Sequence, residues 1–173
     1  MSQQNDEAST DEAVDESSKR LEFSDTVALA TTKEDLWTAI SDPETLTECV
    51  PGAESIERVS ERTYTLEVTR GVAQLTLSLT GEAEFVEMNP PEYIVTTGEA
   101  FDAKTGSDFE ILAAMEMDAT DEGTVLTYKA EVEYSGGVAS VPKRVISPIV
   151  KRDVGTYFEN VRQVVEDDTE AEQ

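Results

Sequence analysis

The side chains that most often carry enzyme chemistry are scarce in this chain. There is no histidine among its 173 residues, and Cys49 is its one cysteine. These absences exclude Ser-His-Asp and Cys-His catalysis, His-ligated zinc, and any disulfide or metal site that needs several cysteines. Cys49 follows Glu48 at the expected end of a short helix and has no basic neighbour. Because a reactive thiol needs an environment that lowers its pKa, we interpret Cys49 as a packing residue.

The remaining motifs also favour structural interpretations. Residues 118–123 (DATDEG) resemble the start of a calcium-binding loop, but Thr120 and Lys129 occupy positions that need oxygen ligands. We therefore expect an acidic hairpin turn there. Phosphate-binding glycine motifs are absent, and no pair of catalytic carboxylates can be singled out among 38 acids. The sequence thus indicates no catalytic residue, no cofactor of its own and no metal ligand.

The charge of the chain is strongly negative, with 38 acidic and 13 basic residues and a net charge of −25. Six of the acids lie in residues 1–18 and five in residues 166–173, and neither segment contains a base. A surface of this sign repels nucleic acid and anionic membranes. Acids spread along the whole chain are typical of halophilic proteins, and an ordinary acidic cytosolic protein is the alternative. Without a signal peptide or an apolar run long enough to span a membrane, we expect a cytoplasmic protein.

The apolar pattern predicts one domain over residues 19–166, between disordered acidic tails at 1–18 and 167–173. Alternating apolar and polar residues predict seven strands, with a bend or bulge at Gly81. Two short helices are expected after the first strand, with a capping box at Thr31 and Glu34 and an N-cap at Asp42 before Pro43. The predicted strands are 21–29, 55–59, 63–69, 75–85, 93–101, 109–119 and 124–134, and the short helices cover about 32–41 and 43–49.

Apolar residues at helical spacing from Val150 to Val165 predict a long C-terminal helix. It either begins near Pro148 or starts earlier and is kinked there. The amphipathic helices are the cover available for one apolar sheet face. We therefore predict an α+β helix-grip fold, in which a curved seven-strand antiparallel sheet wraps around the C-terminal helix and leaves a cavity between them.

Aromatic and methionine side chains are expected on the inward face of this arrangement. A dry packed core is the plainer interpretation, and the lining of a ligand cavity is the alternative. Trp37, on the apolar face of the first helix, is interpreted as core. The cavity candidates are Phe85, Phe109, Ile111, Met115, Met117, Tyr128, Tyr134, Val150, Val154, Tyr157 and Phe158.

Basic residues gather near the start of the C-terminal helix. Lys143, Arg144, Lys151 and Arg152 fall within ten residues, and Arg162 follows on the same helix. They either balance nearby acids and the helix dipole, or form a face that docks an acidic partner or lipid head groups. The first four are the candidates for partner docking.

Several motifs together carry a resemblance. The chain has a tryptophan, then Asp42-Pro43-Glu44, then Cys49-Val50-Pro51-Gly52, followed by a Leu-Thr-Gly-Glu-Ala segment at 79–83. It continues with Asn-Pro-Pro at 89–91, Gly-Thr at 123–124 and Gly-Gly-Val-Ala at 136–139. Over residues 20–165 this pattern resembles the START-like polyketide cyclase superfamily (SRPBCC) and, within it, the family of the carbon monoxide dehydrogenase G protein.

The resemblance implies a helix-grip fold with a hydrophobic cavity and without catalytic residues. It also implies an accessory role toward a molybdenum hydroxylase, in maturation or membrane recruitment, and the binding of a quinone-like or lipid ligand. Peripheral membrane association is compatible with it. Two alternatives stay open: a cyclase or dehydratase that uses Tyr128, Tyr134 or Glu99, and an assembly adaptor that binds no ligand.

Overall fold

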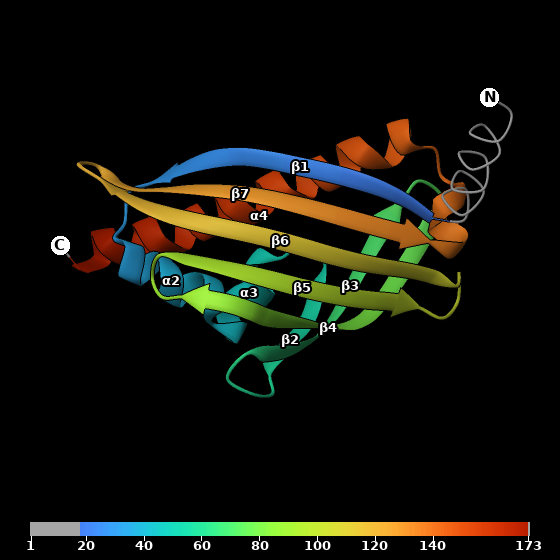
Figure 1. Cartoon of the computed structure of the whole chain (residues 1–173), viewed down its shortest axis with the longest axis horizontal. Coiled ribbons are helices and arrows are strands. Elements are labelled where there is room, and N and C mark those ends of the chain that lie inside the picture. Colours follow the sequence, from blue (N-terminus) through green and yellow to red (C-terminus); the bar gives the residue numbers. More distant parts are fainter. Residues whose placement is uncertain (1–17, 173) are drawn as a thin grey trace, which may run out of the picture.

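The computed structural model of the protein describes residues 18–172 as one sheet with helices (Figure 1). The predicted tail at 1–18 lies outside the described residues except for Ser18, which begins the first strand. The elements are β1 (Ser18–Leu29), α2 (Lys33–Ser41), α3 (Pro43–Cys49), β2 (Ala53–Arg58), β3 (Thr63–Val72), β4 (Leu75–Asn89), β5 (Tyr93–Asp102), β6 (Ser107–Thr120), β7 (Gly123–Ser135), a 3₁₀ turn η1 (Gly136–Ser140) and α4 (Lys143–Glu172).

The seven strands form one antiparallel sheet in the order β1-β7-β6-β5-β4-β3-β2. In Figure 1 the sheet faces the viewer and α4 crosses behind it, while α2 and α3 lie at the end of the sheet near the C-terminus. The concave side of the sheet therefore faces α4, and the outer side faces solvent. This confirms the predicted α+β helix-grip architecture.

Gly81 allows β4 to approach β5 closely where the sheet curves. A Cβ atom at this position would lie 1.9 Å from the Glu99 carbonyl oxygen and 2.7 Å from the Ala100 Cα. Only glycine fits such a distance. The pairing of Gly81 with Ala100 is regular, however, and the register shift lies between Phe85 and Glu87. The bulge expected at Gly81 is thus wrong by several residues.

The N-caps of the two short helices explain where each begins. The Asp35 backbone N–H donates to Thr32 Oγ1 at 3.1 Å, so Thr32 is the N-cap and the predicted capping box at Thr31 is wrong by one residue. Thr31 is instead anchored to β7, because the Thr124 hydroxyl donates to its carbonyl at 2.8 Å. At α3 the prediction is confirmed, since Asp42 accepts from the Thr45 N–H at 2.8 Å.

The C-terminal helix α4 begins at Lys143, so the longer of the two predicted alternatives is correct and Pro148 lies inside it. The helix backbone is described to Glu172, beyond the domain boundary predicted at residue 166. The 3₁₀ turn η1, which precedes α4, was not predicted. Its first residue, Gly136, has a φ of +83°, and a Cβ there would lie 1.7 Å from the Gly106 carbonyl oxygen.

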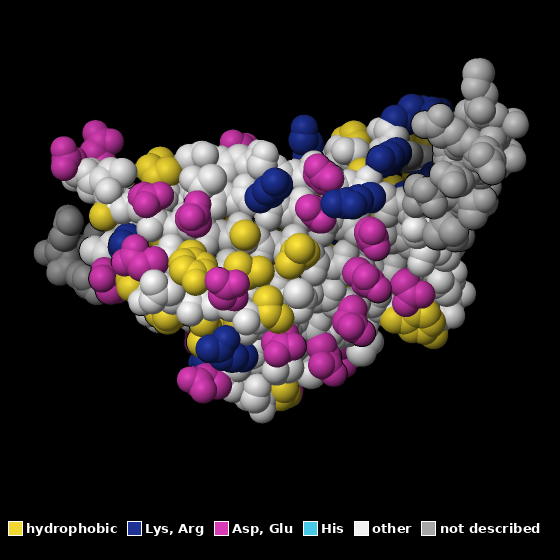
Figure 2. Space-filling view, viewed as in Figure 1, with side chains coloured by type: hydrophobic (Ala, Val, Ile, Leu, Met, Phe, Trp, Pro, Cys, Tyr) yellow, Lys and Arg dark blue, Asp and Glu magenta, His cyan; other side chains and the backbone are white. Residues whose placement is uncertain are grey.

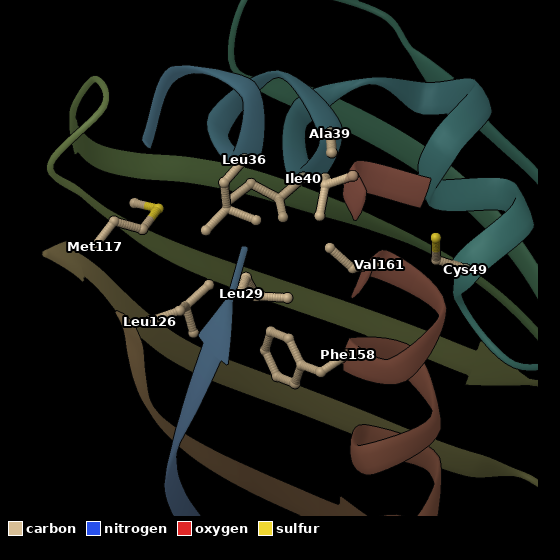
Figure 3. Close-up of a cluster of buried hydrophobic side chains, with 10 residues drawn as sticks. Leu29, Leu36, Ala39, Ile40, Cys49, Met117, Leu126, Phe158 and Val161 are labelled. Carbon is tan, nitrogen blue, oxygen red and sulfur yellow. The ribbon is translucent and has the colours of Figure 1, made fainter. Parts of the chain in front are cut away.

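The core consists of three clusters of buried apolar side chains. Figure 3 shows the first, where α2, α3 and α4 meet the ends of β1, β6 and β7 around Leu36, Leu126 and Val161. The second joins β1, β3, β4 and β7 to η1 and the start of α4. The third contains Tyr64, Phe85 and Ile94. Trp37 packs against the first and third clusters, which confirms its interpretation as a core residue.

Candidate functional site

The concave face of the sheet remains partly open to solvent between the core clusters. Ile111 lies on the inward side of β6, because it alternates with buried Met117 and pairs with buried Val132 of β7. Its side chain is nevertheless 39% exposed. Helix α4 makes most of its contacts with β1, α2 and α3, and leaves this middle part of the face less covered.

Small residues surround this open area on the neighbouring strands. Gly98 of β5 pairs with Ile111 on one side and with Ala83 of β4 on the other, and Ala100 pairs with Phe109. A Cβ added to Gly98 would meet Ile111 and Ala83 Cβ atoms only at 3.9 Å. The open surface is therefore apolar and shallow-walled, which suits an apolar molecule better than a charged one.

The predicted cavity residues all face the concave side, but they divide among the three clusters. Met117 and Phe158 are buried in the first cluster, Tyr134 in the second and Phe85 in the third. The other candidates are half-buried around the open area, except Ile111, which is exposed: Phe109, Met115, Tyr128, Val150, Val154 and Tyr157. The buried residues close the ends of the concave face, and the half-buried ones line its middle.

Aromatic rings stack in two places on this face. Tyr128 lies on Phe158 with ring centroids 4.9 Å apart, and Phe109 lies on Tyr134 at 6.2 Å, both with interplanar angles of 22°. Burial raises the pKa of Tyr134, while burial and then the charge of Asp25 raise the pKa of Tyr128. Both phenols therefore stay protonated at neutral pH.

Glu99, proposed from the sequence as a third polar group for an enzymatic cavity, does not lie there. It pairs with Glu82 and Glu110, whose side chains point to the outer face, and it is exposed. The sequence-based assignment was wrong because the alternation of β5 places Gly98 and Ala100 inward. The concave face thus has tyrosine hydroxyls but lacks this carboxylate.

An ion pair that the sequence analysis missed joins the two sides of the concave face. The Arg70 guanidinium of β3 donates to both carboxylate oxygens of Asp153 of α4, at 2.9 and 2.7 Å. Both side chains are about one quarter exposed. The available signal was an arginine in an inward position of β3, where Tyr64, Leu66 and Val68 alternate with polar residues. Its partner could not be identified from spacing.

Cys49 is a buried core residue at the end of α3. Its side chain is 1% exposed and belongs to the cluster around α2 and α4. Burial, and secondarily the charge of Glu48, raises the pKa of the thiol. The Asn160 side-chain amide donates to the Cys49 carbonyl at 3.0 Å, which ties α3 to α4. These observations confirm the packing interpretation.

Comparison with known proteins identifies the family. A family model for the G protein of carbon monoxide dehydrogenase (CoxG) matches residues 26–166. The chain belongs to the CoxG family. No curated protein matches it.

Solved structures show that the CoxG-family chain has a START-like fold. A conserved protein from Geobacillus kaustophilus is 22% identical with a TM-score of 0.78, and the match covers 85% of this chain and 96% of the other. A protein from Rhizobium leguminosarum is 14% identical with a TM-score of 0.66, covering 87% and 97%. A Staphylococcus aureus protein of unknown function is 13% identical with a TM-score of 0.63, covering 88% and 98%.

Four of the basic residues on α4 are free in this CoxG-family chain. Lys143, Arg144, Lys151 and Arg152 are exposed, and no ion pair or hydrogen bond involves their side chains in the part of the chain that the structure describes. Arg162 differs, because it pairs with Glu159 at 2.6 Å and donates to the Ala28 carbonyl at 3.0 Å. The first four residues, called the basic stripe below, are thus accessible for docking.

The largest hollow of the described structure lies on the outer face of the sheet, not on the concave face. It has a volume of about 910 Å³ and is lined by residues of β4 to β7. Glu82, Glu99, Glu110 and Glu133 pair directly across these four strands and form a row of carboxylates through it. Figure 2, which shows this outer face, displays a band of acidic side chains across the strands. Such a lining is unsuited to an apolar ligand.

The acidic turn at residues 118–123 connects β6 to β7, as expected. Among residues 18–172, no group of three or more acidic or cysteine side chains is arranged to hold a metal ion. None of the helices in the same part of the chain is long and apolar enough to cross a membrane.

Proposed function

We propose that this protein binds an apolar small molecule, such as a quinone or another lipid, on its concave face and serves as a non-enzymatic accessory to a molybdenum hydroxylase. The observation that carries the ligand half is the 39% exposure of inward-facing Ile111. A large apolar side chain that solvent reaches inside a folded domain is a binding surface more often than a packing error.

The surroundings of Ile111 support an occupant of moderate size. Gly98 and Ala83 leave space above β4 and β5, and the half-buried rings of Phe109 and Tyr128 border the same surface. The ion pair between Arg70 and Asp153 spans from β3 to α4 and holds the two walls at a fixed separation. An apolar molecule seated there would cover Ile111 and remove apolar area from water.

The polar groups of the concave face support binding rather than catalysis. Tyr128 and Tyr134 keep their protons at neutral pH because their pKa values are raised, so neither acts as a general base. Glu99, the carboxylate that an enzymatic alternative required, lies on the outer face. Membership of the CoxG family agrees with an accessory role.

The accessory half of the proposal rests on the basic stripe. Four unpaired cations on one helix segment are unusual in a chain with a net charge of −25. They offer a complementary surface to an acidic region of a partner enzyme, where charges guide association and register. The adaptor alternative, in which docking occurs without any ligand, depends on the same stripe.

The ligand half is tested with a variant that fills the concave face. We expect native mass spectrometry and thermal shift in high salt to show binding of menaquinone or another lipid to the wild type. Gly98→Phe should abolish this, because its ring would occupy the space beside Ile111. Gly71→Phe is the matched control, since a Cβ there meets nothing within 4 Å. If the wild type retains none of the molecules in the panel, the ligand half is wrong.

The accessory half is tested by reversing charges on α4. Arg144→Glu with Lys151→Glu should abolish co-purification with a molybdenum hydroxylase. Lys104→Glu with Lys129→Glu gives the same net charge but changes exposed residues elsewhere. An equal loss in both double variants would show that net charge, not the stripe, governs association. Co-purification that survives reversal of the stripe would refute docking through α4.

A further inference from the structure

The hydroxyl group of Tyr134 is buried without a hydrogen-bond partner. The residue is 1% exposed, and no atom among residues 18–172 pairs with its hydroxyl. Buried hydroxyl groups in folded proteins almost always have a partner, so this one calls for an explanation. Tyr64 provides the comparison within the same sheet. It is 2% exposed, and its hydroxyl donates to the Ser41 carbonyl at 2.5 Å.

The environment of Tyr134 is otherwise apolar. It belongs to the cluster that joins the sheet to η1 and the start of α4, and the half-buried ring of Phe109 stacks on it at 6.2 Å. Val138, Val141 and Ile146 supply the helical side of that cluster. Burial raises the pKa of the phenol, so the group is a permanent hydrogen-bond donor within apolar surroundings.

Tyr134 also lies next to the open part of the concave face. It pairs across β6 with Phe109, and Ile111 is two residues further along that strand on the same side. A molecule lying on Ile111 and displacing or sliding past the ring of Phe109 therefore meets the hydroxyl of Tyr134 as the first unsatisfied donor. The nearly parallel rings, at 22°, favour a flat group at this position.

We propose that Tyr134 is the polar anchor of the ligand site and selects apolar molecules that carry a carbonyl oxygen on a flat ring. Its hydroxyl donates a hydrogen bond to that oxygen, while the rest of the molecule lies on Phe109 and Ile111. This inference rests on the proposed ligand-binding function and names the chemical feature that the site recognises. It assigns Tyr134 a role in specificity, with no bond made or broken.

The test uses two probes of the same shape, 2-methyl-1,4-naphthoquinone and 2-methylnaphthalene, which differ in the two carbonyl groups. Their affinities for the full chain are measured by equilibrium dialysis in high salt. Tyr134→Phe should weaken the quinone about threefold to tenfold, the range expected for one net hydrogen bond, and leave the hydrocarbon unchanged. Tyr64→Phe, the matched control, should leave the affinities for both probes as in the wild type.

The two tyrosine variants also separate a ligand anchor from a structural hydroxyl. Tyr64→Phe should lower the melting temperature because it leaves the Ser41 carbonyl without its donor. Tyr134→Phe should not lower it, since no partner is lost. A drop in the melting temperature with Tyr134→Phe as large as that with Tyr64→Phe would overturn the inference, because the hydroxyl would then already be satisfied.

The failure of this inference is distinguishable from the failure of the proposed function. If both probes bind and Tyr134→Phe changes neither affinity, the anchor is refuted while ligand binding on the concave face stands. If neither probe binds the wild type, the anchor for flat-ring carbonyl compounds is refuted as well, and the lipid panel with Gly98→Phe then decides the wider function.

Discussion

The row of glutamates on the outer face predicts a stability that depends strongly on salt. Glu99 lies between two directly opposed carboxylates, Glu82 and Glu110, and Glu110 in turn faces Glu133. Side chains in directly opposed positions have Cβ atoms about 4.5–5.5 Å apart, and like charges there destabilise the sheet. Glu99→Gln removes two such repulsions while it keeps the size of the side chain.

The size of the effect follows from the pairing. Each cross-strand pair contributes about 0.2–1 kcal/mol, so two relieved repulsions should stabilise the fold by about 1 kcal/mol at low salt. For a domain of this length, that corresponds to a rise of about 2–4 °C in the melting temperature. The Debye length falls from about 10 Å at 0.1 M salt to about 3 Å at 1 M. The advantage of the variant should therefore disappear at high salt.

The assay is thermal unfolding followed by circular dichroism between 0.1 and 2 M KCl. Glu122→Gln in the β6–β7 turn is the control, because it changes the net charge equally outside the row. A gain for Glu99→Gln no larger than that for Glu122→Gln at 0.1 M would refute the reasoning. So would a gain that persists undiminished at 2 M. A wild type that is stable only in high salt would support the halophilic origin expected from composition.

Three further predictions concern buried groups. Cys49→Val should leave ligand binding within twofold of the wild type, and the native thiol should not react with Ellman's reagent, because Cys49 is buried with a raised pKa; rapid labelling of the folded protein would contradict this. Asp153→Asn should lower the free energy of unfolding by about 1 kcal/mol in urea titrations, since the Arg70 guanidinium loses its half-buried partner; an unchanged midpoint would count against it. The pKa of Asp102 is lowered, chiefly by the hydrogen bond from the Thr105 hydroxyl. This carboxylate therefore stabilises the fold above about pH 4, its unfolded value, and the stabilisation is lost as the pH falls through the lower folded value. The difference in melting temperature between wild type and Asp102→Asn should shrink below pH 4, and a constant difference down to pH 2 would disprove the assignment.

Local patterns in the sequence were sufficient for the elements and for several single residues. Strict alternation in residues 75–85 and 124–134 depends only on neighbours along the chain, so it predicted β4 and β7 and the faces they bury. The N-cap at Asp42 and the packing role of Cys49 were predictable for the same reason. The capping box was placed one residue early, because Thr31 and Thr32 are chemically alike and only the bond from Thr124 distinguishes them.

The pairing of distant strands settled the remaining features. Composition and short-range periodicity were enough to predict that this chain is acidic, lacks histidine and folds as a helix-grip domain. The folded sheet was needed to show that Glu82, Glu99, Glu110 and Glu133 form one row, because strand register depends on contacts across the whole sheet. It likewise placed Glu99 outside and left Tyr134 without a partner. A side chain's partners in a curved sheet are set by which strands meet, and no spacing along the chain encodes that.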